Sequence, residues 1–388
     1  MAGPRSRTAL ADVVACRESW KLENDTVSLY ITKRGGMMAP VRFFPGASMS
    51  FEPYYISPWQ CEDTAPADPV LQTLRGDFFC MPFGAGGSSG GEYHDSHGET
   101  AILEWDLEDA GMFEAVGSDE VDAGPASKRP ESRTVRHIDV LLRTSARPGT
   151  VHKSVSLVDG HAAVYVRHVL EGFHGAMPLG HHATLKGAPD ENPALVSTSS
   201  LRYGITAPRE ASYHAGGEYY ALRPLAEFAS LRAVPTVWSD DPTTDLSVFP
   251  GRPGFVDIAQ VFQEPGEVPA WTTVTFPSEG FLWYSLKDAR VLPSTVLWME
   301  NRGRHQQPWN GRNCCLGLED VCSFVAEGLG PSVGDNPARS RGLPTAVELS
   351  PAQPFVVNYV QGVVAVQEGF RRVVNVEFGP QEITFHDE

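Results

Sequence analysis

Residues 151–172 read VHKSVSLVDGHAAVYVRHVLEG, and this stretch decides the fold class. Two short runs rich in β-branched residues stand on either side of Asp159-Gly160, a pair typical of a two-residue hairpin turn. In the second run His168 is in step with the apolar residues of one strand face, which favours a buried structural histidine over a ligand. The stretch therefore predicts an antiparallel β-hairpin.

The rest of the chain follows the same pattern. Residues 134–143, Thr272–Phe276 and Phe281–Leu286 are further short β-branched or aromatic runs, and the 37 glycines and 31 prolines indicate many turns. No alternation of strands with helices predicts a parallel sheet. We therefore predict an all-β fold, a large antiparallel two-sheet β-sandwich with few short helices, forming a single domain over residues 1–388.

Four segments carry local predictions. Residues 84–91 are almost all Gly and Ser and predict a flexible loop, and the acidic residues 110–133 predict an exposed loop or hairpin excursion. After Glu319, apolar residues at helical spacing predict a short helix that ends at Gly330-Pro331. Residues 345–386 predict three more strands.

The charge balance excludes some partners. The chain has 31 Lys and Arg against 48 Asp and Glu, a net charge of -17, so nucleic acid and anionic membrane surfaces are poor partners and a small ligand fits better. Residues 1–15 lack the apolar core of a signal peptide, and the apolar run 355–366 is too short to span a bilayer. We therefore expect a cytoplasmic protein without a membrane anchor. The sequence does not determine the oligomeric state.

The six cysteines are scattered through the chain rather than spaced as a disulfide framework. We expect most of them to be reduced and buried. The cysteines near residue 319 have no C-x-x-C partner, so their spacing favours simple packing over a zinc site.

Residues 309–324 (WNGRNCCLGLEDVCSF) concentrate the chemistry, and Glu319 is the candidate working residue. Trp309 and Asn310 combine a stacking face with an amide, which suits a sugar ring as well as core packing. A carboxylate at a helix start is the structural alternative for Glu319, and Asp320 reads as such a residue. Far upstream, Arg75 at the edge of an apolar strand could bind sugar hydroxyls or a phosphate, or form a structural ion pair.

Four segments resemble the galactose mutarotase-like superfamily. Residues 74–84 (LRGDFFCMPFG) are similar to the RGGxPxCxPxFG segment of hexose-6-phosphate mutarotases, and His97-Gly98 followed by Trp105 resembles their HGFAR...W stretch. Residues 180–185 (GHHATL) are similar to the strand that carries the second histidine of the superfamily. Residues 315–319 (CLGLE) resemble its late strand, which ends in the catalytic glutamate.

The resemblance implies an aldose 1-epimerase that opens and recloses a sugar ring on a concave sheet face, with no metal or cofactor. By this resemblance Glu319 is the base, His182 or His181 the acid, and His97 a second polar contact. Neighbouring strand residues point to opposite faces, so only one member of the histidine doublet can face the sugar, and we prefer His182. Asp257 stands where the family often places a substrate-binding aspartate.

The sequence also departs from the family pattern. Ala101 stands where the family has an arginine, and the aromatic pair after the second histidine is absent. The resemblance therefore does not determine whether the sugar is neutral, acidic or phosphorylated.

Two other classes of function stay open. A non-catalytic carbohydrate-binding protein could keep the same cleft. A metal-dependent, cupin-like enzyme could use His94, His97, Glu99 and one histidine of the doublet as ligands, although this spacing differs from the usual H-x-H arrangement. Elemental analysis of the purified protein would separate the metal enzyme from the mutarotase.

Overall fold

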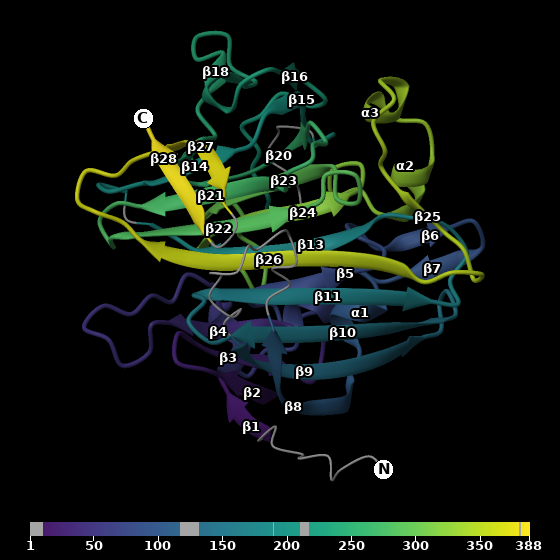
Figure 1. The fold of residues 1–388 in the computed structure, drawn as a ribbon. Coiled ribbons are helices and arrows are strands. Elements are labelled where there is room, and N and C mark those ends of the chain that lie inside the picture. The colour runs from purple at the N-terminus through teal and green to yellow at the C-terminus, as the bar shows by residue number, and fades with distance from the viewer. Residues whose placement is uncertain (1–10, 117–131, 189, 210–216, 380–381) are drawn as a thin grey trace.

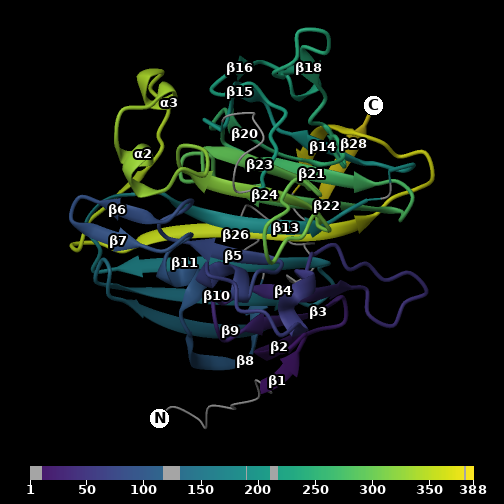
Figure 2. The ribbon, with the colours of Figure 1, turned by 180° about the vertical axis from the view of Figure 1, so that it is seen from behind.

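Two large antiparallel sheets stacked face to face form the body of the protein (Figures 1 and 2). The computed structural model describes residues 11–116, 132–188, 190–209, 217–379 and 382–388. In the described part of the chain all pairings between strands of the two large sheets are antiparallel, and the longest helix has five residues. The predicted all-β sandwich with few short helices is therefore confirmed.

The first sheet has eleven strands. In spatial order they are β1 (Ala11–Val14), β2 (Arg17–Glu23), β3 (Val27–Thr32), β4 (Met38–Phe43), β5 (Asp77–Cys80), β13 (Leu179–Lys186), β24 (Cys314–Cys322), β23 (Ser294–Asn301), β20 (Phe255–Gln263), β15 (Leu201–Thr206) and β16 (Glu227–Phe228). Strands from three distant parts of the sequence, β5, β13 and β24, thus lie side by side at its centre.

The second sheet has nine strands. In spatial order they are β19 (Val248–Phe249), β14 (Ala194–Thr198), β21 (Ala270–Phe276), β22 (Phe281–Lys287), β26 (Phe355–Ala365), β11 (Ala163–Glu171), β10 (Gly149–Val158), β9 (Ser132–Thr144) and β8 (Asp106–Val116).

Smaller elements decorate the sandwich. The two-stranded pairs are β6 (Gly87–Ser89) with β7 (Glu92–His94), β12 (Gly175–Met177) with β25 (Val347–Leu349), β17 (Val234–Pro235) with β18 (Thr243–Thr244), and β27 (Val373–Phe378) with β28 (Ile383–Asp387). The helices are α1 (Glu99–Ile102), α2 (Leu329–Val333) and α3 (Pro337–Ser340), and the 3₁₀ turns are η1 (Pro58–Cys61), η2 (Pro69–Gln72) and η3 (Leu231–Ala233).

Apolar side chains cover both faces of the first sheet. One cluster fills the space between the sheets and includes Phe79, Leu318 and Trp283. A second cluster lies on the outer face of the first sheet and includes Phe78 and Trp298. Because strands covered on both sides need no polar face, β24 has an apolar run rather than a strict alternation.

The hairpin that decided the fold class is present. Strands β10 and β11 pair with Val155 opposite Val166, and the N–H of His161 donates to the carbonyl of Val158 at 3.0 Å, which closes the turn at Asp159-Gly160. His168 is fully buried between the sheets and stacks on Phe79 with ring centroids 4.0 Å apart. Its predicted place on an apolar strand face is therefore confirmed.

A buried ion pair joins the two sheets. Lys287 of β22 donates to the carboxylate of Asp320 on β24, and both side chains are at most 1% exposed. Hydroxyl groups of Thr295 and Ser285 donate to the same carboxylate at 2.6 Å, and that of Tyr359 donates at 2.9 Å. Burial works against this charge, but Lys287 and the hydroxyl donors outweigh it and hold the pKa of Asp320 below its ordinary value.

The helix predicted between Glu319 and Gly330-Pro331 is wrong. Gly330 and Pro331 do not end a helix but lie inside the later helix α2. Strand β24 continues through Cys322, so Glu319 and Asp320 are strand residues, and α2 begins only at Leu329. The first apolar residues of the predicted helix belong to a strand that is buried on both faces. In such a strand an apolar run fits the helical period of 3.6 residues as well as the strand period of 2.

Two further local predictions need correction, and a third is confirmed in part. Residues 84–91 contain β6, which pairs with β7 instead of forming a plain loop. Residues 110–116 belong to β8, which pairs antiparallel with β9, so the hairpin alternative predicted for residues 110–133 is confirmed for the described residues, while 117–131 lie outside them. Residues 345–386 form four strands rather than three, because β25 adds a short pair with β12.

Cys16 and Cys61 form a disulfide that the sequence did not predict. A separation of 45 residues carries no spacing signal, and the two meet only because the turn after β1 lies against η1. The other four are free, and Cys80, Cys315 and Cys322 are buried, as expected for most of the cysteines. Disulfides persist mainly outside the reducing cytoplasm, which weighs against the cytoplasmic expectation. Of the helices in the described ranges, none has the length and apolar character needed to cross a membrane.

Replacing Asp320 by Asn should destabilise the protein strongly, because Lys287 would keep a buried charge without a counter-ion. We expect the free energy of unfolding to fall by about 3–5 kcal/mol in chemical denaturation. Asp288→Asn is the matched control. Asp288 follows Lys287 in the sequence, is partly exposed and pairs with Arg290 at the surface, so this substitution should change the free energy of unfolding by less than about 1 kcal/mol. Equal stability of D320N and the wild type would contradict a structural role for the ion pair.

Candidate active site

Two neighbouring strands place two doublets of polar residues opposite each other. The register of β13 and β24 pairs Gly180 with Val321 and Ala183 with Leu318, so the doublet His181-His182 faces the doublet Glu319-Asp320. Successive side chains alternate between the faces of a sheet. His181 and Asp320 therefore point between the sheets, whereas His182 and Glu319 point outward.

On the outer face His182 and Glu319 meet. Nε2 of His182 lies 3.2 Å from Oε1 of Glu319, and the two side chains are only 5% and 3% exposed. The imidazole stacks on Phe78 with ring centroids 4.6 Å apart, and its Nδ1 lies 3.2 Å from the hydroxyl of Thr184. The ring is therefore held on its face and at its far nitrogen, with Nε2 left to the carboxylate.

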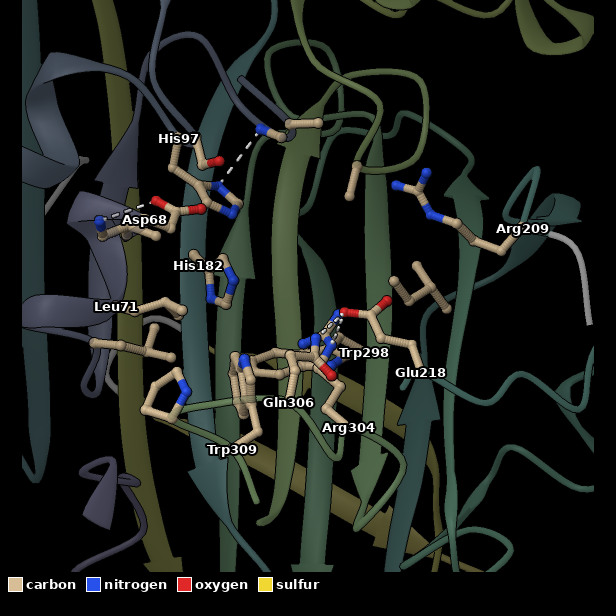
Figure 3. A pocket seen from close by; sticks show the side chains of 18 of the residues that line it. Asp68, Leu71, His97, His182, Arg209, Glu218, Trp298, Arg304, Gln306 and Trp309 are labelled. Carbon is tan, nitrogen blue, oxygen red and sulfur yellow. Dashed lines mark hydrogen bonds and ion pairs between the residues drawn. The ribbon is translucent and has the colours of Figure 1, made fainter. Parts of the chain in front are cut away.

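A cavity of about 770 Å³ opens above this pair, and His97, His182 and Glu319 line it. Figure 3 shows this cavity from close by, with His97 and His182 labelled. In the figure His97 and His182 lie on one side of the cavity and Glu218 and Arg209 on the other. Charged, aromatic and apolar side chains all contribute to the wall, and those used below are Asp68, Arg209, Glu218, Tyr220, Trp298, Arg304, Gln306 and Trp309.

His97 comes from the loop before α1. Its backbone has φ +61°, and Gly98 follows at φ +73° with so little space that a Cβ would lie 2.0 Å from the carbonyl oxygen of Met81. Nδ1 of His97 accepts a hydrogen bond from the N–H of Gly84 at 3.4 Å, which assigns the ring proton to Nε2. The ring centroid lies 5.0 Å from that of His182, so His97 offers a donor beside the pair.

Burial sets the protonation of the site. It raises the pKa of Glu319 to about 8, against the opposing charge of Arg304. It also lowers the pKa of His182 well below its ordinary value, and together with the charge of Arg304 lowers the pKa of His97 to about 4. At neutral pH His97 is therefore uncharged. The Glu319–His182 pair shares one titratable proton, and burial favours the form in which this proton lies on the carboxyl group and the imidazole is neutral.

Trp309 lines the cavity, and sequence reasoning missed its neighbours Trp298 and Arg304. The two indole rings are nearly perpendicular, at 88°, with centroids 5.8 Å apart. The guanidinium of Arg304 lies over both rings, and its Nε lies 3.1 Å from Oε1 of Glu218. Arg304 and Glu218 are 86 residues apart, so no local pattern could have joined them, whereas Trp298 on a buried strand gave a weak aromatic signal.

Arg75 is not in the cavity. It is fully buried and donates to the backbone carbonyls of Val14 and Ala15 at 3.1 and 2.9 Å and to the amide of Gln60 at 3.2 Å. In the described part of the chain Arg75 makes no ion pair with Asp77 or another acid, and it lies outside the cavity where a substrate contact was predicted. Arg75 instead stabilises the turn that carries the disulfide.

His181 does not line the cavity either. Its Nδ1 lies 3.0 Å from Oδ2 of Asp77, and its ring stacks on Tyr359 of the other sheet with centroids 4.0 Å apart. The alternation of β13 thus resolves the doublet, since His182 faces the cavity and His181 the core. The substrate-binding place predicted for His181 is corrected accordingly.

Asp257 and Asn310 lie beside the cavity without lining it. The carboxylate of Asp257 accepts hydrogen bonds from the backbone N–H groups of Ala221 and Leu222 at 2.8 and 3.2 Å, and burial raises its pKa to about 6. It therefore positions the segment of Tyr220, which does line the wall. Asn310 is exposed at φ +54°, and its amide donates to Gln307 at 3.3 Å.

The residues of the metal-enzyme alternative are not gathered together. His94 pairs with Glu92 at 2.9 Å, and Glu99 accepts hydrogen bonds from Ser145. Over the described ranges, one group of three or more candidate ligands has its atoms within 4.8 Å of one another, and it consists of Asp109, His137 and Asp139 on β8 and β9. That group belongs to the other sheet and shares no residue with the predicted set.

Comparisons with known proteins agree with this architecture. The chain is similar in structure to a candidate aldose 1-epimerase from Klebsiella pneumoniae (12% identity, TM-score 0.58, 91% of this chain and 80% of that chain). It is also similar to a candidate mutarotase from Salmonella typhimurium (11%, 0.54, 90% and 91%) and to a galactose mutarotase-like protein from Lactobacillus casei (11%, 0.53, 89% and 100%). No protein-family model and no curated protein sequence matches. At these identities the likeness shows the fold, and the chain has the galactose mutarotase-like fold that its motifs predicted.

Gly317, two residues before Glu319 on the same face of β24, should be needed for the position of the carboxylate. An added Cβ would lie 2.7 Å from Oε1 of Glu319 and 2.9 Å from the ring of Trp298. Gly317→Ala should therefore displace the carboxylate from His182, and any activity that needs the two groups in contact should fall at least tenfold, roughly the effect of misplacing a catalytic group. Stability should change by no more than about 2 kcal/mol.

The control for G317A is Gly266→Ala, where an added Cβ would have no contact closer than 3.8 Å. We expect wild-type activity from G266A. A crystal structure of G317A with the Glu319 carboxylate still beside Nε2 of His182 would contradict the steric argument.

Proposed function

We propose that this protein is an aldose 1-epimerase that interconverts the anomers of a sugar by acid–base ring opening at Glu319 and His182. The observation that carries the proposal is a buried carboxylate–imidazole pair, 3.2 Å apart, on the wall of a cavity of about 770 Å³. Mutarotation needs a base at the anomeric hydroxyl and an acid at the ring oxygen. Because both oxygens are bonded to the same carbon, a base and an acid in contact with each other fit the reaction.

Ring opening and ring closure are opposite proton transfers across this pair. In opening, Glu319 takes the proton of the anomeric hydroxyl while His182 gives a proton to the ring oxygen, and the bond between that oxygen and the anomeric carbon breaks to leave an aldehyde. Rotation exposes the other face of the aldehyde. In closure, the freed hydroxyl attacks that face, His182 takes its proton and Glu319 returns a proton to the carbonyl oxygen. Protons and electrons balance over the cycle.

The burial of the pair supports this cycle. Opening converts a carboxylate beside an imidazolium into a carboxyl group beside a neutral imidazole. Burial disfavours the charged forms, as the raised pKa of Glu319 and the lowered pKa of His182 indicate. The neutral pair is therefore the resting form, and opening proceeds from its minor form, in which the shared proton lies on His182, back to the neutral form that burial favours. Strongly shifted pKa values in a cavity are typical of catalytic groups.

His97 and Trp309 complete the proposed sugar site. His97 is neutral and carries its proton on Nε2, so it can donate to a sugar oxygen near the ring-oxygen side. Trp309 offers an apolar face for the C–H groups of the ring.

The charges around the cavity favour a neutral sugar over a phosphorylated or acidic one. Arg209 is paired with Glu327 at 2.9 Å, and Arg304 with Glu218 at 3.1 Å. Asp68 carries a carboxylate that has no cationic partner among the residues described. An anionic ligand would thus have to break an existing ion pair or meet this carboxylate, and the net charge of -17 opposes it at long range.

Glu319→Gln tests the assignment directly. Anomer exchange measured by NMR over a panel of neutral, acidic and phosphorylated sugars should be fastest with neutral sugars in the wild type. In E319Q it should fall by about a thousandfold, because glutamine cannot accept the proton. Sugar affinity measured by calorimetry should change only a few-fold, since glutamine has nearly the same shape.

The control is Glu279→Gln at a partly exposed ion pair with Lys186 outside the cavity, which should keep full activity. Unchanged turnover in E319Q would refute the role of Glu319. A wild type that binds sugars without exchanging their anomers would favour the carbohydrate-binding alternative.

The rate should depend on pH through the single proton of the pair. Raising the pH through about 8 removes that proton and leaves no acid, so kcat/KM should fall by about tenfold per pH unit above this value. Lowering the pH protonates His182 as well as Glu319 and leaves no base, but only well below the ordinary pKa of histidine. We therefore expect a plateau through neutral pH. An alkaline limb that begins below pH 7 would contradict the raised pKa of Glu319.

A further inference from the structure

Arg304 lies at the junction of the two tryptophans that line the cavity. Its guanidinium carbon is 5.1 Å from the ring centroid of Trp298 and 4.9 Å from that of Trp309. The two rings are perpendicular to each other, and Trp309 makes a second edge contact with Trp59 at 4.9 Å. With the Arg304 side chain only 15% exposed, these contacts are largely shielded from water, where a cation above an aromatic face is worth most.

Acidic groups hold the guanidinium in this place from two sides. Nε of Arg304 donates to Glu218 at 3.1 Å, and Gln306 and Tyr220 donate to the same carboxylate. Nε of Arg304 also lies 3.8 Å from Oε2 of Glu300, which is fully buried. The other oxygen of Glu300, Oε1, accepts hydrogen bonds from the backbone N–H groups of Gly303 and Arg304. Burial opposes the charge, but Glu300 and Glu218 outweigh it and raise the pKa of Arg304, which stays cationic.

Trp298 connects this cation with the catalytic pair. Its indole lies 5.8 Å from the ring of His182, and it flanks the space at Gly317 next to the carboxylate of Glu319. Figure 3 shows Trp298 and Arg304 together on the wall between His182 and Glu218. A shift of the guanidinium would therefore change the packing of the indole that borders both catalytic groups.

The other titratable groups that face Glu319 cannot replace this charge. They are His182 on β13, His97 in the loop before α1, Cys315 on β24 itself and Cys80 on β5. Burial keeps both histidines uncharged at neutral pH and raises the pKa of both thiols. Arg304 is the cation that lowers the pKa of Glu319 against the effect of burial.

We propose that Arg304 is a positioning residue, which locks the Trp298–Trp309 wall in place and supplies the fixed positive charge that keeps Glu319 able to act as a base. The inference rests on the proposed function, because it assigns Arg304 a task in the same reaction. Arg304 is not a receptor for an anionic substrate, since its guanidinium is already paired with the carboxylate of Glu218 and lies over two rings. Its removal should therefore alter the catalytic pair rather than the choice among charged sugars.

Arg304→Met removes the positive charge and keeps much of the side-chain volume. Two measurements that do not depend on enzyme activity report the effect of this change. The first is the titration of the Glu319 carboxyl group by ¹³C NMR of glutamate-labelled protein, with the signal assigned by its absence in E319Q. We expect its midpoint to move upward by about one pH unit in R304M, since an opposite charge nearby favours the ionised form. The second is near-ultraviolet circular dichroism, which should lose intensity as the indoles become less ordered.

Two further variants complete the design. Arg304→Lys keeps the charge but not the planar fork, so the Glu319 midpoint should stay near the wild-type value while the dichroism falls. Arg302→Met is the matched control, because this exposed arginine on the same turn should leave both signals unchanged. In the anomer-exchange assay, R304M should lower kcat/KM at least tenfold at neutral pH and move its alkaline limb upward with the NMR midpoint.

The outcomes separate the two proposals. A Glu319 midpoint that is the same in R304M and the wild type would overturn the electrostatic task of Arg304, and unchanged dichroism in R304M and R304K would overturn its task in the wall. If R304M does not fold, the NMR midpoint and the circular dichroism of R304K still show whether the charge of Arg304 or its planar shape is needed. Absence of anomer exchange in the wild type would instead defeat the proposed function, whatever the NMR midpoints show.

Discussion

The ion pair between Lys287 and Asp320 fixes which way strand β24 faces. A strand alternates its side chains between two sides, so a slip of one residue would exchange all of them. The carboxylate of Asp320 is held by the buried ammonium group of Lys287 and by hydroxyl groups of Ser285 and Tyr359, all from the opposite sheet. These contacts are available only on the side of β24 that faces that sheet. Glu319 must therefore point outward. The same rule operates on β13, where His181 is held by Asp77 in the core and His182 is left to the cavity.

The two adjacent carboxyl groups of β24 show how environment divides one residue type into two tasks. Asp320 is paired with a cation and has its pKa lowered, so it remains a structural anion. Glu319 is equally buried but faces an uncharged imidazole and has its pKa raised to about 8. The Cα atoms of neighbouring residues are only about 3.8 Å apart, so the difference comes from the partners on each face and not from depth.

Much of the fold and the centre of the site could be predicted from the sequence. The Asp159-Gly160 turn and the recurring short strands indicated the sandwich, and the motifs around His97, His182 and Glu319 indicated the residues that the structure brings together. The residues after Glu319 were misread because burial on both faces of a strand hides the usual periods. Arg75 was misread because its hydrogen-bond partners, the carbonyls of Val14 and Ala15, are 61 and 60 residues away in the sequence. Arg304 and Glu218 could not be found, since their pairing depends on two loops that meet only in the folded protein.

The central position of β13 between β5 and β24 also has a consequence for the order of folding. Its two neighbours lie about a hundred residues or more away in opposite directions along the chain. During synthesis the strand that carries His182 emerges well before the one that carries Glu319. Until β24 is made, the first sheet has an open edge at its middle, and the imidazole has no carboxylate beside it. The candidate active site is therefore completed late, by the same strand addition that closes the sheet, and a chain cut short before residue 314 would lack both the complete site and the closed sheet.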